Sequence, residues 1–89
     1  MLRVGKMNRP VSQELAAAAQ ALATVSDTPR LDAELLMAHA LGVSRSDMLL
    51  RHMRDTVPAG FAALVERRQA HEPVAYIIGE QEFFGLPLR

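Results

Sequence analysis

Cysteine is absent from this 89-residue sequence, and its only aromatic residues are three phenylalanines and one tyrosine. Without cysteine the chain cannot form disulfide bonds, thiolate zinc sites or a cysteine nucleophile. Net charge is absent as well, because ten basic residues balance ten acidic ones. The chain therefore has no general electrostatic attraction for nucleic acid or anionic lipid, which argues against a nucleic-acid-binding function.

A long apolar run is also missing. The longest weakly polar stretch, residues 15–25, is mostly alanine and is far shorter than the roughly 20 apolar residues of a membrane-spanning helix. We expect a soluble protein that does not enter a membrane. A chain of this length makes at most one domain, and such a domain buries only roughly 60–65% of the surface that its unfolded chain exposes. A complete cofactor-dependent active site is not expected in it.

The N-terminal segment is basic and carries no acid before residue 14. A basic start can belong to a targeting peptide, but no apolar region or small-residue cleavage site follows it. We interpret residues 1–12 as a flexible, solvated terminus.

Two helices are indicated in the first half of the chain. Ser12 can cap a first helix, whose apolar residues recur at helical spacing as far as Val25. Thr28 followed by Pro29 is typical of the N-cap and first turn of a second helix, which Gly42 is expected to end.

Two further helices follow. Ser44 and Asp47 form a pair similar to a capping box at the start of a third, shorter helix. Pro58 opens a fourth helix, with apolar residues at positions i, i+3 and i+4. This helix should end near His71, because the residue before Pro73 is disfavoured in a helix.

The pattern changes near the C-terminus. A turn of helix is expected from Pro73 to Ile78, but Phe83 and Phe84 then lie in a short segment between two glycines. This composition favours an extended strand or hairpin arm, in which adjacent side chains face opposite sides. Because an isolated hairpin is marginally stable, we interpret the arm as a domain junction. The predicted fold is all-α: a small bundle of four or five helices with a C-terminal extended arm.

Several short motifs occur in a fixed order along the chain. They are Leu31-Asp32-Ala33-Glu34-Leu35-Leu36, His39-Ala40-Leu41-Gly42, Glu66-Arg67-Arg68, Glu72-Pro73-Val74-Ala75-Tyr76-Ile77-Ile78-Gly79 and Glu82-Phe83-Phe84-Gly85-Leu86. In this order they resemble the N-terminal region of the HemK-type release factor glutamine methyltransferases. The resemblance covers about two thirds of the chain, and before Leu31 only a helix-like composition is shared.

The resemblance implies a helical N-terminal domain over residues 13–79 and the start of a β-hairpin linker over residues 80–89. A Rossmann-like domain absent from this chain would follow. In the family, that domain transfers a methyl group from S-adenosylmethionine to the glutamine side-chain amide of a Gly-Gly-Gln motif in class 1 peptide chain release factors. The implied partners are a class 1 release factor and the parent protein's own catalytic domain, and the implied location is the cytoplasm.

The family's catalytic motifs have no counterpart in this chain. Its five glycines form no Gly-x-Gly sequence, and its sole asparagine, Asn8, is followed by arginine rather than by the Pro-Pro-Tyr of the family's Asn-Pro-Pro-Tyr motif. We therefore assign no catalytic, cofactor-binding or metal-binding residue, and do not expect this chain alone to be an enzyme. S-adenosylmethionine would be bound by the parent enzyme outside it.

Candidate partner-binding residues lie on or beside the third helix. Arg45, Arg51 and Arg54 can form a basic face for an acidic partner, although Asp47 and Asp55 dilute its charge. The candidate domain-junction residues are Tyr76, Phe83 and Phe84, and Tyr76 is expected to bury its ring while its hydroxyl stays paired.

Other polar residues have simpler interpretations. The three histidines lack the i, i+4 spacing of a helical zinc site, and His39, among apolar neighbours, is interpreted as structural. Arg67 and Arg68 can pair with Glu72, and the resemblance implies that they brace the fourth helix against the following loop.

Two alternative functions remain open from the sequence. The Gly42 turn superficially resembles a helix-turn-helix, so a nucleic-acid-binding module would bind DNA with a steep salt dependence. The other alternative is a bundle that only supports the catalytic domain and does not contact the release factor.

Overall fold

The computed structural model describes residues 9–85, and for residues 80–85 it describes the backbone alone. The described range contains five helices and no β-strand apart from a single antiparallel bridge between Pro10 and Thr56. The helices are α2 (Val11–Leu22), α3 (Pro29–Leu41), α4 (Arg45–Arg51), α5 (Phe61–Gln69) and α6 (Val74–Gly85). The all-α prediction is confirmed.

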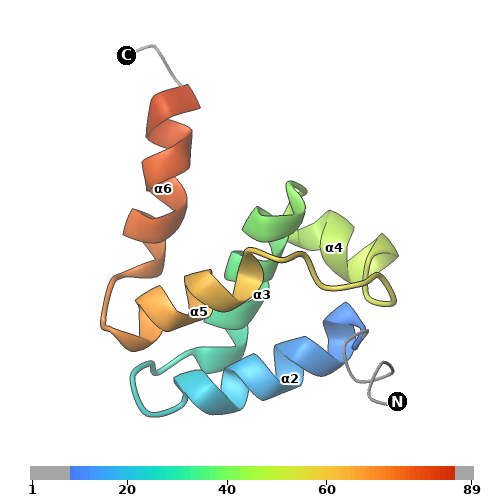
Figure 1. Ribbon diagram of the computed structural model, residues 1–89, viewed down its shortest axis with the longest axis horizontal. Coiled ribbons are helices and arrows are strands. Elements are labelled where there is room, and N and C mark those ends of the chain that lie inside the picture. Colours follow the sequence, from blue (N-terminus) through green and yellow to red (C-terminus); the bar gives the residue numbers. More distant parts are fainter. Residues whose placement is uncertain (1–8, 86–89) are drawn as a thin grey trace.

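The hydrophobic core lies mainly between α2 and α3, which are joined by a short loop and make the most extensive contact of any two described helices (Figure 1). Burying one large aliphatic side chain contributes about 1.5–3 kcal/mol relative to leaving it exposed, so a few such residues can hold a small bundle together. α4, α5 and α6 contribute fewer buried apolar side chains each. The buried apolar residues are Val11, Leu15, Ala18, Leu22, Ala33, Leu36, Met37, Ala38, Met48, Phe61 and Ile77.

Three predicted helix ends are confirmed. α3 begins at Pro29 with Thr28 as its N-cap and ends at Gly42, whose φ of 77° lies in the left-handed region that favours glycine. At the start of α4, the Ser44 hydroxyl oxygen accepts a hydrogen bond from the Asp47 backbone N–H at 3.1 Å.

The predicted start of α2 was wrong. Pro10, not Ser12, is the N-cap, and no side chain caps the helix. The first N–H groups instead donate to loop carbonyls, Val11 to Asp55 at 2.9 Å and Ser12 to Met53 at 3.0 Å. Because these distant carbonyls satisfy the free donors of the first turn, a side-chain cap is not needed. α5, by contrast, begins later than predicted, at Phe61 rather than Pro58.

The extended segment predicted after Gly79 is helical in the structure as far as Gly85, within α6. The turn expected from Pro73 to Ile78 is therefore only the beginning of a longer helix. A strand needs a partner for its backbone groups and the described residues offer none, whereas a helix satisfies them internally. The argument for a junction from alternating side chains assumed a strand, so it no longer applies. Residues 86–89 lie outside the described range, and the domain boundary remains a prediction.

α6 leaves the bundle at a sharp turn after α5 and runs away from the other helices (Figure 1). Among the described residues it contacts only α3 and α5.

Candidate functional site

Two of the three candidate partner-binding arginines are engaged within the domain. The Arg45 Nε donates to Glu34 Oε1 at 2.7 Å, and the Arg51 Nε lies 3.3 Å from Asp47 Oδ1. Arg54, just beyond the end of α4, is exposed and makes no ion pair with another described residue. The structure places all three near α4, but Arg54 has the charge most available to a partner.

Glu34, the acid that holds Arg45, is buried in α3 with its side chain only 8% exposed. Its second oxygen accepts from the Arg30 Nε at 2.9 Å, so one carboxylate links two arginines. Burial acts to raise the pKa of Glu34, but hydrogen bonds from Arg30 and Arg45, together with their positive charges, outweigh it and lower the pKa below its ordinary value of 4.5. Glu34 is therefore a charged anchor between α3 and the start of α4.

Sequence reasoning did not identify Glu34 as a buried anchor. The only local signal was the i, i+4 spacing of Arg30 and Glu34 on α3, which predicts a helical ion pair but says nothing about burial. The bond to Arg45 depends on how α4 folds back on α3.

Exposed leucines lie beside the arginines of α4. The exposed fraction is 77% for Leu50 and 38% for Leu49, so only Met48 of the apolar run at positions 48–50 enters the core. Single exposed leucines are common on protein surfaces. Here, however, Leu50 precedes Arg51 directly and Arg54 follows within a turn. We define the α4 surface as Leu50, Arg51 and Arg54; it offers one apolar side chain flanked by two cations.

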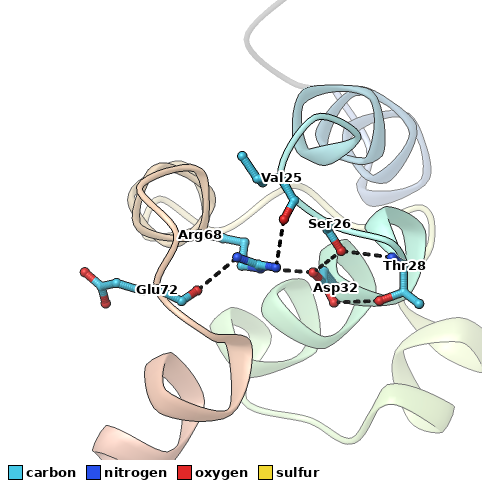
Figure 2. Close-up of polar contacts among 6 residues, drawn as sticks. All are labelled: Val25, Ser26, Thr28, Asp32, Arg68 and Glu72. Atoms are coloured by element: carbon cyan, nitrogen blue, oxygen red, sulfur yellow. Dashed lines mark hydrogen bonds and ion pairs between the residues drawn. The ribbon is translucent and has the colours of Figure 1, made fainter.

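A second polar group, the Arg68 cluster, surrounds the end of α5 (Figure 2). The Arg68 Nε donates to Asp32 Oδ2 at 3.0 Å, its Nη2 to the Val25 carbonyl at 3.2 Å, and its Nη1 to the Glu72 carbonyl at 3.4 Å. Arg67 also contacts Glu72, with its Nη2 2.7 Å from Oε1. The predicted pairing with Glu72 is confirmed for Arg67, whereas Arg68 forms its ion pair with Asp32 and reaches only the backbone carbonyl of Glu72. Through these contacts both arginines connect the end of α5 to the loop that follows it, as predicted.

Asp32 is held in place from its other side. The hydroxyl of Ser26 donates to Asp32 Oδ2 at 2.7 Å, and the hydroxyl of Thr28 donates to Oδ1 at 3.2 Å. The side chains of Arg68 and Asp32 are only 16% and 10% exposed. The Arg68 cluster comprises Val25, Ser26, Thr28, Asp32, Arg68 and Glu72, and the sequence indicated neither Asp32 nor the α2–α3 loop as part of it.

The predicted junction residues lie in α6. Tyr76 is 56% exposed, so the expectation that its ring is packed was wrong. The backbones of Phe83 and Phe84 are helical, and their side chains are not described. An exposed aromatic ring on the helix that leaves the bundle keeps the junction role of Tyr76 open as a prediction.

The histidines form no common site. His39 is half-buried and lines a groove of about 370 Å³ between α3 and α6, beside Ile78 and Arg45. The His52 Nδ1 lies 2.7 Å from Asp55 Oδ2, and His71 is exposed. Among the described residues, no group of three or more His, Cys, Asp or Glu side chains could hold a metal ion.

None of the helices in the described part of the chain is long and apolar enough to span a membrane.

Comparison with known proteins gives one consistent result. Residues 13–79 match the family model described as the PrmC N-terminal domain. The release factor glutamine methyltransferase of Coxiella burnetii is 38% identical over 92 residues, covering 100% of this chain and 31% of the relative. That of Corynebacterium glutamicum is 46% identical over 79 residues, covering 89% of this chain and 26% of the relative.

A third relative, the release factor glutamine methyltransferase of Nitratidesulfovibrio vulgaris, is 48% identical over 62 residues, covering 66% of this chain and 21% of the relative. The chain thus spans between 21% and 31% of the length of these three relatives. No solved structure matches it. The family model covers the helices from α2 to the first part of α6, and the relatives agree with the resemblance of the sequence motifs. The chain belongs to the PrmC N-terminal domain family.

Proposed function

We propose that this chain is the substrate-recognition and positioning domain of an S-adenosylmethionine-dependent methyltransferase. The reaction would be N5-methylation of the glutamine in the Gly-Gly-Gln motif of a class 1 peptide chain release factor, in the cytoplasm. The observation that carries the proposal is the match of residues 13–79 to the PrmC N-terminal domain, together with relatives named release factor glutamine methyltransferases.

In this proposal the chain contributes orientation rather than chemistry. S-adenosylmethionine and the residues that act on the glutamine amide belong to the part of the parent enzyme that lies outside these residues. Holding the release factor while its glutamine meets the methyl donor reduces the translational and rotational entropy lost at the chemical step.

The α4 surface is the contact that we propose for the release factor. Its exposed Leu50 offers an apolar side chain that a partner can desolvate, and burying a leucine side chain contributes about 1.5–3 kcal/mol. Arg51 and Arg54 beside it would mainly tune the rate of encounter with an acidic patch. Arg45 is a weaker candidate, because Glu34 already holds it.

An NMR titration of the isotope-labelled chain with an unlabelled class 1 release factor tests this surface, with duplex DNA as the specificity control. We expect amide shifts confined to α4 and the loop after it, and none with DNA. Leu50→Ala should weaken binding by about tenfold, since an anchor residue contributes at least 1 kcal/mol. Leu31→Ala is the matched control, because Leu31 is also an exposed leucine but lies on α3.

A structural support without partner contact is the second candidate, and one observation favours it: Arg45 and Arg51 are both paired inside the domain. It predicts no shifts with release factor or DNA, while the bundle still restores activity to a separated catalytic domain. Shifts with DNA that weaken steeply as salt is added would instead indicate the nucleic-acid-binding alternative.

A further inference from the structure

α6 has only a short apolar attachment to the bundle. Among its described side chains, Ile77 is buried at 1% exposure, and Val74 and Ile78 are partly buried against the core. All three lie in the first five residues of the helix. Because hydrophobic contact is non-directional, these residues hold the start of α6 against α3 and α5 but do not by themselves fix the direction in which the helix runs.

The turn between α5 and α6 has a defined backbone geometry. His71 has a φ of 76°, the left-handed conformation that glycine usually adopts at this position. Its N–H donates to the Arg68 carbonyl at 2.9 Å, and the Glu72 N–H donates to the Arg67 carbonyl at 3.2 Å. This pair of bonds is a Schellman motif, with histidine in place of glycine. The motif ends α5 and presents the Glu72 carbonyl to the side chain of Arg68.

Arg68 connects this turn to two other parts of the chain. One guanidinium group reaches the Glu72 carbonyl in the turn, the Val25 carbonyl in the α2–α3 loop and the Asp32 carboxylate in α3 (Figure 2). A planar guanidinium donates in fixed directions, so satisfying three acceptors together allows little freedom in their relative positions. Ser26 and Thr28 fix the carboxylate of Asp32 from the other side.

We propose that Arg68 is a positioning residue that sets the direction in which α6 leaves the bundle, by fastening the α5–α6 turn to Asp32 and the α2–α3 loop. A buried ion pair contributes little net stability compared with an apolar replacement, but it can select one arrangement over others. The inference concerns the helices of this chain and does not depend on the proposed function.

Residual dipolar couplings of backbone amides test the inference directly, because they report the orientation of one helix relative to another. They are to be measured for residues 74–79 of α6 and for α2, α3 and α5 in the complete chain. The test variant is Arg68→Met, which keeps an apolar side chain of similar length but removes the guanidinium group. The control is Arg30→Met, which also removes a guanidinium from a buried carboxylate, but from that of Glu34 rather than from the acceptors that Arg68 joins to the α5–α6 turn.

In the unsubstituted chain we expect the couplings of all four helices to fit a single rigid arrangement. In Arg68→Met, the couplings of α2, α3 and α5 should still fit one arrangement, while those of residues 74–79 should no longer fit it. Either α6 takes another direction, or the backbone order parameter of these residues falls to about 0.6 from the roughly 0.85 of a rigid backbone. Arg30→Met should keep the arrangement of the unsubstituted chain.

Couplings of residues 74–79 that keep the original direction in folded Arg68→Met would overturn the inference, even if the variant melted at a lower temperature. Should Arg68→Met fail to fold, Arg68→Lys decides the question. A lysine keeps the charge beside Asp32, but its single ammonium group does not reproduce the planar three-way geometry. A redirected or loosened α6 in this variant supports the inference, and an unchanged α6 contradicts it.

Discussion

The α2–α3 pair and the helices added to it are held together by different means. α2 and α3 meet through buried aliphatic side chains, whereas α4 and α5 are each also fastened to α3 by an arginine bound to a buried carboxylate. The two carboxylates are Asp32 and Glu34, two residues apart on α3. Because residues two apart point to roughly opposite sides of a helix, Asp32 can reach α5 while Glu34 reaches α4. One helix thus combines a non-directional interface with two directional attachments.

Disrupting the buried aliphatic contact between α2 and α3 should have the largest effect on stability. Leu36 is fully buried in α3, and we expect Leu36→Ala to lower the free energy of unfolding by about 2–5 kcal/mol through lost transfer energy and a cavity. Urea denaturation followed by circular dichroism measures this loss. Leu31→Ala, at a leucine that is 40% exposed on the same helix, should cost far less. Equal losses in the two variants would contradict the core assigned to α3.

Removing one of the two buried carboxylates that hold an arginine should lower stability by less, and by an amount that depends on pH. The pKa of Glu34 is lower in the folded chain than its ordinary value of 4.5. Its stabilisation is therefore fully present above about pH 4.5 and is lost as the pH falls through the lower folded value. We expect Glu34→Gln to cost about 1.5 kcal/mol at pH 7, typical of a hydrogen bond to a charged group, and less at pH 3.

Urea denaturation of Glu34→Gln at pH 7 and pH 3 measures that difference. Glu66→Gln is the matched control because Glu66 is an exposed acid on α5. Its loss of stability should not depend on pH in the same way. If Glu34→Gln lowers the free energy of unfolding by the same amount at both pH values, the carboxylate is not held as the structure indicates.

The last prediction compares two helix ends, one of which gives the smallest change in stability that we expect. Gly42 and His71 both have φ values near 77°, but only one is glycine. Gly42→Ala should cost about 1–2 kcal/mol, because open space surrounds the site and only the left-handed backbone is penalised. His71→Gly removes that penalty but adds unfolded-state entropy, so it should raise stability by at most about 1 kcal/mol. Thermal melts of both variants provide the test, and a stabilised Gly42→Ala would contradict the assigned backbone.

Local signals in the sequence predicted those parts of the fold that depend on neighbouring residues. Thr28, Pro29 and Gly42 mark the ends of α3 correctly, since a cap acts within about one turn of the helix. Ser12 was wrongly predicted as the start of α2 because the groups that satisfy its first turn come from a distant loop. The segment after Gly79 was predicted as extended from its aromatic and glycine composition, although a strand also requires a partner.

The candidate site was predictable only in part, for the same reason. Arg45, Arg51 and Arg54 are visible in the sequence, but the acid that engages Arg45 lies eleven positions earlier, on another helix. The link between Arg68 and Asp32 spans 36 positions and depends on how α5 packs against α3. Side-chain type identified the cations, and only the tertiary structure shows which of them remain available to a partner.

The backbone bonds at the start of α2 bear on the order of folding. Val11 and Ser12 donate to carbonyls of Asp55 and Met53, which lie in the loop after α4. Contacts between positions far apart in sequence form after local ones, because a long loop must close first. The α2–α3 hairpin can therefore form early from neighbouring segments, while the first turn of α2 is completed only when the loop after α4 arrives. Changes in the length of that loop would slow the final step of folding more than they would disturb the early hairpin.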